Sequence, residues 1–249
     1  MDSGNIGFVL LCAAFVFVMT PGLAMFYGGL VRKKNVVNTM MTSIFIIGVG
    51  IVMWVLFGYS LSFAPSGNAF IGDFRWLGLE GVSLTDGYTD NASIPNMVFS
   101  AFQMMFAVIT PALITGAVAG RMKFKSIFVF TIFWSLIVYY PLAHMVWGQG
   151  GLLGADGIGA LDFAGGDVVH ISSGVSALVL CILLGKRHDY EHSIYRIHNI
   201  PTVVLGASLL MFGWFGFNAG SALAADGLAA HAFMTTGVSA AAAMLSWML

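Results

Sequence analysis

Long apolar runs separated by shorter polar stretches dominate the pattern of this chain. Seven runs approach the roughly 20 residues that a helix needs to cross a bilayer: 6–31, 40–63, 95–120, 126–147, 167–185, 200–222 and 228–249. The short alternating segments of a transmembrane β-barrel are not visible between them. The pattern therefore predicts an all-α polytopic membrane protein with about seven transmembrane helices in this chain.

The composition agrees with that prediction. Of the 249 residues, 59% are hydrophobic and only 8% are charged, and the mean hydropathy is +0.91. A soluble domain has about a quarter of its residues charged, so the chain is not one. The 31 glycines fit the same class, because helices in lipid associate through small residues that let their backbones approach closely.

The charged residues lie asymmetrically between the runs. Nine of the ten basic residues follow the first, third or fifth run: Arg32, Lys33, Lys34, Arg121, Lys123, Lys125, Lys186, Arg187 and Arg196. Nine of the eleven acidic residues lie in the connections of the other side or at the N-terminus. The positive-inside rule then predicts a multi-pass membrane protein with its N-terminus outside and the basic connections in the cytoplasm. The location expected for the protein is the plasma membrane.

His170 is the most telling of the ionisable residues that fall inside the apolar runs. His170 stands in "DVVHISSG", and a helix that begins near residue 163 would place it about 10 Å inside. Ionisable groups within membrane segments usually face a bundle interior or a cavity. His170 is either a packing histidine bonded to a neighbouring helix or a proton-handling group, since imidazole titrates near neutrality.

Asp162 opens the same run, in "ALDFAGG". Its carboxylate can accept backbone N–H groups and complement the positive end of the helix dipole, which makes it a helix cap. The spacing favours that interpretation. A carboxylate that attracts a cation is the alternative.

Aromatic residues gather at the same outer level. Phe217 and Ser221 in "GWFGFNAGSALAAD" are spaced i, i+4, so they share one helix face, and Trp147 closes the fourth run. Alone, Trp147 would be an interfacial belt anchor, and Phe106 in "AFQMMFAVIT" a lipid-facing or core residue. Together, the levels predict Trp147 and Ser221 at the outer rim, the two phenylalanines deeper, and a histidine near or below them. Such an aromatic vestibule suits a small cation.

Several stretches resemble the Amt/Mep/Rh ammonium transporter family, among them "FYGGLVRKKN", "PLAHMVWGQGG", "LDFAGGDVVHISSG", "HNIP" and "GWFGFNAGSALAA". They occur in the family's order and cover residues 1–249, which the resemblance identifies as one ammonium transporter membrane domain. It implies an inverted-repeat fold of eleven helices, of which this chain supplies helices one to seven. It also implies a homotrimer with one pore per protomer.

The resemblance implies roles for particular residues on the outer side. Trp147, Ser221 and Phe106 match the site that recruits ammonium, and Asp162 matches a buried carboxylate that supports it. Phe106 and Phe217 match a stacked phenyl gate. No cofactor or metal ion is implied.

Further residues match the pore. His170 matches the first of two pore histidines and would form the proton relay, while Tyr139 and Phe26 match wall or vestibule positions. The second pore histidine has no counterpart: His231 lies in the seventh run, and the remaining histidines after the fifth run lie in a cytoplasmic connection, at His188, His192 and His198. The chain therefore resembles a truncated transporter, and a non-conducting fragment is one alternative.

The function that the resemblance implies is movement of ammonium across the bilayer by recruitment, deprotonation and passage through a hydrophobic, histidine-lined pore. An ammonium sensor or receptor of the same fold is the other alternative. A PII-type signal protein is implied as a cytoplasmic partner around Lys33, Lys123 and Lys186. Nothing in the sequence indicates binding of nucleic acid.

The sequence does not favour an enzymatic or a haem-binding function. His170 and Ser172 in "HISSG" suggest a hydrolase dyad, but residues i and i+2 of a helix point to different sides. A haem would need two histidines on facing helices, and His144 is the other candidate. The sequence thus predicts a protein that is not an enzyme.

Overall fold

The computed structural model describes residues 1–65, 67–89, 92–155, 157–187, 190 and 194–249, and the regular elements within these ranges are helical. Asp90, Asp156, His188 and His192 lie outside the described residues. The long helices are α1 (Ser3–Leu30), α2 (Val36–Met53), α4 (Asn96–Val118), α5 (Phe124–Trp134), α7 (Ser172–Leu184), α8 (Ile200–Gly220) and α9 (Gly227–Trp247).

Shorter elements extend three of the membrane spans. A 3-10 turn at Lys33–Asn35 precedes α2, and a π-helical turn at Trp54–Gly58 joins α2 to α3 (Tyr59–Phe63). Another π turn, Ser135–Tyr139, joins α5 to α6 (Tyr140–Trp147), and a third, Gly166–Ile171, precedes α7. A 3-10 turn at Leu77–Leu79 lies in the long connection after α3.

Seven helical spans are long and apolar enough to cross a membrane within the described residues, as the apolar pattern predicts. The largest difference is at the second span, which begins at Lys33 instead of 40. Helices extend past the hydrocarbon into the polar interface, where charged residues remain solvated, so hydropathy alone underestimates their length.

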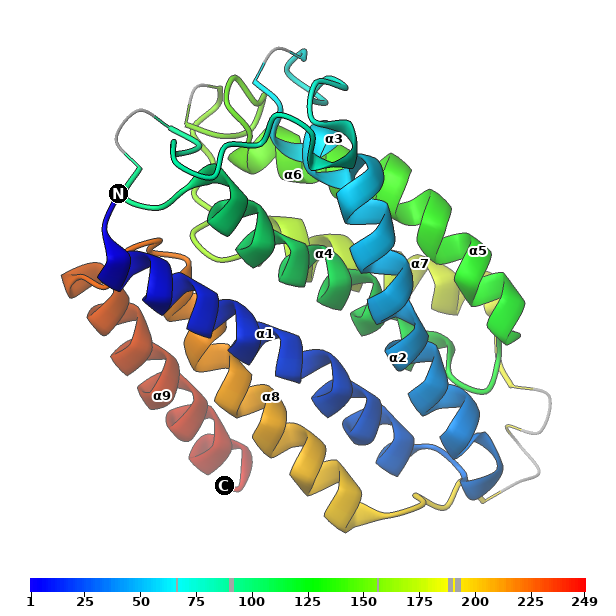
Figure 1. Ribbon diagram of the computed structural model, residues 1–249. Coiled ribbons are helices and arrows are strands. Elements are labelled where there is room, and N and C mark those ends of the chain that lie inside the picture. Colours follow the sequence, from blue (N-terminus) through cyan, green and yellow to red (C-terminus); the bar gives the residue numbers. More distant parts are fainter. Residues whose placement is uncertain (66, 90–91, 156, 188–189, 191–193) are drawn as a thin grey trace.

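Helix α4 lies at the centre of the bundle. It packs against α1, α2 and α7, and it is the most buried of the spans. Figure 1 shows α1, α8 and α9 on one side of the bundle and α2 and α5 on the other. The long connection between α3 and α4 covers the end at which the N-terminus lies.

Glycines set the spacing between α1 and α8, which run side by side (Figure 1). A methyl group on Gly206 would lie 2.4 Å from the backbone nitrogen of Phe26, and one on Gly213 would lie 2.6 Å from the carbonyl oxygen of Phe15. The two backbones are therefore in direct contact at these positions. This is the close approach that the glycine-rich composition predicts.

The long connection between α3 and α4 is fastened to the helix ends by aromatic and polar contacts. Tyr59 stacks on Trp76 with ring centroids 5.3 Å apart. His144, which is buried, has Nδ1 3.1 Å from the Ser62 carbonyl oxygen and Nε2 2.8 Å from that of Asn68. Because both ring nitrogens face backbone oxygens, His144 has no nitrogen available for a haem iron, and that alternative fails.

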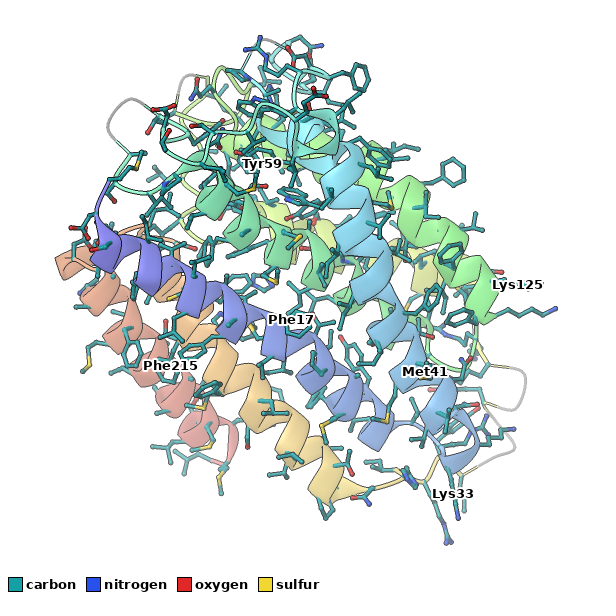
Figure 2. The ribbon with its side chains drawn as sticks, in the orientation of Figure 1. Phe17, Lys33, Met41, Tyr59, Lys125 and Phe215 are labelled. Atoms are coloured by element: carbon teal, nitrogen blue, oxygen red, sulfur yellow. The ribbon has the colours of Figure 1, made fainter. Side chains whose placement is uncertain are left out.

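Basic residues gather at the opposite end. In Figure 2, Lys33 and Lys125 lie at the same end of the bundle, far from Tyr59. Arg121 Nη1 donates to the Gly185 carbonyl oxygen at 2.9 Å, and Arg187 Nη2 donates to that of Ala119 at 3.1 Å. These arginines bind carbonyl groups where α4 and α7 end, which complements the negative ends of the helix dipoles.

The α1–α8 contact yields a stability prediction. Replacing Gly206 with alanine should lower the free energy of unfolding by about 1–3 kcal/mol, because the added methyl group overlaps the α1 backbone. Gly48→Ala is the matched control, since a methyl group there meets no atom within 4 Å. The control should be neutral or stabilising by up to about 1 kcal/mol. Thermal unfolding in detergent measures both, and equal melting temperatures would contradict the packing argument.

Candidate functional site

Two phenyl rings from different helices meet in the interior. The ring centroids of Phe106 on α4 and Phe217 on α8 are 4.4 Å apart with an interplanar angle of 37°, and each residue is 1% exposed. The ring of Trp147 lies 6.1 Å from Phe106, edge to face at 89°. Phe102, one turn before Phe106, adds a further edge contact at 4.9 Å.

A cavity of about 250 Å³ lies above these rings. Phe106, Trp147, Asp162 and Ser221 all line it, although they come from four separate parts of the chain. Its other lining residues are Tyr88, Thr89, Phe99, Gln103, Phe163 and Leu223. We call this cavity the vestibule. The structure thus brings together the four residues that the resemblance assigns to one site.

The carboxylate of Asp162 caps the turn that follows it. Its Oδ1 accepts the amide N–H groups of Gly165 at 2.5 Å and Gly166 at 2.8 Å, and its Oδ2 accepts those of Asp167 at 2.8 Å and Val168 at 3.0 Å. The cap expected from the sequence is therefore present. Both oxygens are engaged with the backbone, so Asp162 acts on the vestibule by shaping its wall.

Trp147 is held by the same segment. Its indole Nε1 donates to the main-chain carbonyl oxygen of Asp162 at 2.9 Å. The indole ring is therefore fixed against the vestibule wall, and the one hydrogen-bond donor of the side chain is satisfied.

Gly165 makes the tight turn after Asp162 possible. Its φ of 112° lies in the left-handed region, and a methyl group there would lie 2.7 Å from Val169 Cγ2. The Gly165 carbonyl oxygen accepts the N–H groups of both Val169 and His170 at 3.0 Å, which starts the π-helical turn. Turns of this kind re-aim side chains and are frequent at functional sites.

His170 lies behind the phenyl pair. Its ring stacks on Trp214 with centroids 5.4 Å apart and an angle of 14°, and it lies 5.9 Å from Phe217. The helix begins at Gly166, later than the start near 163 assumed from the sequence, so His170 is only about 6 Å along it. The expected depth of about 10 Å was wrong because Asp162 to Gly165 form a capped turn. The series from Trp147 through the phenyl rings to His170 holds.

Ser221 ends α8 one turn after Phe217. Its hydroxyl donates to the Phe217 carbonyl oxygen at 2.9 Å, as the i, i+4 spacing allows. The hydroxyl hydrogen is thereby engaged, and the oxygen keeps its lone pairs for a donor in the vestibule.

Two residues expected at the wall or vestibule do not line the vestibule. Tyr139 is 1% exposed and packs against Trp134 at 6.3 Å and Tyr140 at 5.9 Å. Phe26 is half-buried on α1, where it contacts Tyr27 at 5.8 Å. A place for either residue in a pore wall stays a prediction.

Sequence reasoning missed three residues of this site: Phe102, Gln103 and Trp214. The spacing carried a signal for each, because Phe102 precedes Phe106 by four residues, Gln103 precedes it by three, and Trp214 precedes Phe217 by three. Such spacings place side chains on one helix face. They become evidence only once the partner residue is known to face a cavity.

The fold and the site define a polytopic α-helical membrane protein with an aromatic vestibule above a histidine. The chain belongs to the Ammonium Transporter Family, whose family model matches residues 7–249. It is 52% identical to an ammonium transporter of Bacillus subtilis, across 100% of this chain and 60% of that relative. It is 42% identical to ammonium transporter Amt1 of Archaeoglobus fulgidus, with the same shares covered.

Solved structures agree. The crystal structure of Candida albicans Mep2 matches 100% of this chain and 55% of that chain, with a TM-score of 0.89 and 34% identity. A structure described as a sensor Amt protein matches 98% of this chain and 60% of that chain, with a TM-score of 0.85 and 28% identity. The chain thus spans about 60% of the length of the curated relatives it matches.

The Asp162 cap yields a stability prediction. Asp162→Ala leaves four amide N–H groups without their acceptor, so the free energy of unfolding should fall by well over the ~1 kcal/mol typical of one helix cap. Asp226→Ala is the matched control, because Asp226 accepts only the Ala229 N–H, at 2.9 Å. Denaturant unfolding should rank the Asp162 loss clearly above the Asp226 loss. Equal losses would show that the four bonds do not act together.

Proposed function

We propose that the protein of which this chain forms a part transports ammonium across the plasma membrane. The observation that carries the proposal is the continuous series Trp147, Phe106, Phe217 and His170, which leads from the vestibule past a closed phenyl pair to an imidazole. The membership of the Ammonium Transporter Family supports the choice of substrate.

Recruitment rests on the aromatic wall and the hydroxyl of Ser221. The ring faces of Trp147 and Phe106 attract a cation, by about 1–2 kcal/mol when it is desolvated. The Ser221 oxygen accepts one of its N–H groups. Asp162 holds this wall in shape through its backbone bonds and the Trp147 indole.

Deprotonation follows from burial behind the phenyl pair. Transfer of a cationic acid into an apolar site disfavours its charged form, so the ion loses a proton as it passes Phe106 and Phe217. The imidazole of His170, 5.9 Å from Phe217, is the first group able to carry that proton. Ammonia and the proton then move separately along the pore.

Replacement of His170 by alanine tests the relay. Because the chain spans about 60% of its relatives, currents are measured on a chimera in which residues 1–249 replace the matching part of the Bacillus subtilis transporter. Ammonium-driven currents in proteoliposomes should be abolished or change their ion selectivity. Unchanged currents with the same selectivity would contradict the relay role.

The same chimera separates transport from sensing. The structural likeness to a sensor Amt protein keeps an ammonium sensor or receptor as the second candidate. A receptor would bind ammonium without current, whereas a transporter would give both signals. A surface groove of about 510 Å³ is lined by Trp214, whose ring stacks on His170. The surroundings of His170 are therefore open to the surface in residues 1–249, and an open pore wall favours the alternative that these residues alone do not conduct.

We also propose that the N-terminus lies outside and the basic end in the cytoplasm. In variants whose native cysteines Cys12 and Cys181 are replaced by alanine, a membrane-impermeant maleimide applied to intact cells should label Thr85→Cys and not Lys125→Cys. Both positions are exposed: Thr85 lies in the connection between α3 and α4, and Lys125 lies in the first turn of α5 at the opposite end of the bundle. Labelling of Lys125→Cys and not of Thr85→Cys would show that the orientation is the opposite of the one proposed. We further propose that the protein forms a homotrimer and that a PII-type protein binds at the basic end. Native mass spectrometry tests the trimer in the absence of the PII-type protein and the binding in its presence.

A further inference from the structure

One polar side chain of the vestibule lacks a partner. Gln103 on α4 is 9% exposed, and its Oε1 is buried without a hydrogen bond to any described residue. A buried carbonyl left unsatisfied costs about 1–3 kcal/mol. Native proteins retain such groups rarely, and those retained call for an explanation.

The position of Gln103 suggests what its partner is. It lies one turn before Phe106 and one turn after Phe99, and all three residues line the vestibule. The amide therefore belongs to the same helix face as the gate ring. Rotation of the terminal amide exchanges its oxygen and nitrogen with almost no change in volume, because that torsion is broad and roughly two-fold.

We propose that the Gln103 carbonyl oxygen accepts an N–H bond from ammonium in the vestibule, an inference that rests on the proposed function. The charged group and the indole of the vestibule are already engaged. Both Asp162 oxygens accept backbone N–H groups, and the Trp147 indole donates to the Asp162 carbonyl. Beside the phenyl rings, Ser221 after α8 and Gln103 on α4 each offer an oxygen as an acceptor.

This arrangement gives Gln103 a role in selectivity. Ring faces attract any small organic cation, with or without N–H groups. A carbonyl acceptor favours only a cation that can donate to it, and no hydrogen bond from a described residue to Gln103 Oε1 has to be broken first. Gln103 thereby distinguishes ammonium, which has four N–H donors, from tetramethylammonium, which has none.

The test measures binding of both cations to the purified protein in nanodiscs. Thermal stabilisation is titrated with ammonium chloride and with tetramethylammonium chloride at constant ionic strength, because a ligand of the folded state raises the melting temperature with its concentration. Gln103→Met removes the acceptor at nearly constant size. It should weaken ammonium binding about tenfold and leave tetramethylammonium binding unchanged, as expected for one hydrogen bond to a charged group.

Two further variants keep the test decisive. Gln103→Glu keeps an acceptor oxygen and should bind ammonium at least as tightly as the wild type. This variant still tests the proposal if Gln103→Met fails to fold. Gln149→Met is the matched control, since Gln149 Nε2 donates to the Tyr88 carbonyl oxygen at 2.9 Å and Gln149 is not a vestibule residue. It should alter stability and leave the ratio of the two affinities unchanged.

The outcomes separate this inference from the proposed function. If Gln103→Met leaves the affinity ratio unchanged, or Gln103→Glu weakens ammonium binding, Gln103 does not coordinate the ion, although recruitment by the aromatic wall stands. If wild-type protein binds ammonium and Trp147→Ala does not, that recruitment is supported. If the wild type binds neither cation, the proposed function fails at this site, and the role of Gln103 fails with it.

Discussion

The site depends on the carboxylate of Asp162. A chain that re-enters a helix at the outer edge of a bilayer exposes its first amide N–H groups, and lipid offers no acceptor for them. Asp162 satisfies four at once, and its own carbonyl oxygen holds the indole of Trp147. The cap thus determines where the π-helical turn starts, where His170 points and where the aromatic wall stands. Both carboxylate oxygens of Asp162 therefore hold the backbone of the vestibule wall.

The proposed path combines weak and strong attractions for a cation. The ring faces of Phe106 and Trp147 attract positive charge without fixing its orientation, while oxygen acceptors favour ions that can donate hydrogen bonds. In the proposed mechanism the phenyl pair excludes water, and burial there disfavours the charged form, so recruitment and deprotonation occur at different levels of the path. His170, stacked on Trp214 and 5.9 Å from Phe217, lies beyond the phenyl pair.

Helix packing makes these layers possible. Glycines such as Gly206 and Gly213 bring α1 into backbone contact with α8, the helix that carries Phe217 and Ser221. Helix α4, held between α1, α2 and α7, carries Phe106. The 4.4 Å distance between the two phenyl rings depends on where α4 and α8 lie relative to each other. Substitutions at the glycines should shift the phenyl pair through the position of α8.

The sequence by itself determined the class and the order of the elements. Apolar length predicted the spans to within a few residues, and the "LDFAGG" turn predicted the Asp162 cap, because both depend on interactions between near neighbours in the chain. Charge placement predicted an orientation that remains a proposal. Only the tertiary structure decided which side chains share a cavity. Phe106 would pass for a core residue, Phe26 and Tyr139 were expected at the wall or vestibule and do not line the vestibule, and the spacing of Gln103 from Phe106 gained meaning only once the cavity was known. The physical reason is that the helices packed against a helix face decide whether its side chains line a cavity or fill the core. Those contacts join residues more than a hundred positions apart.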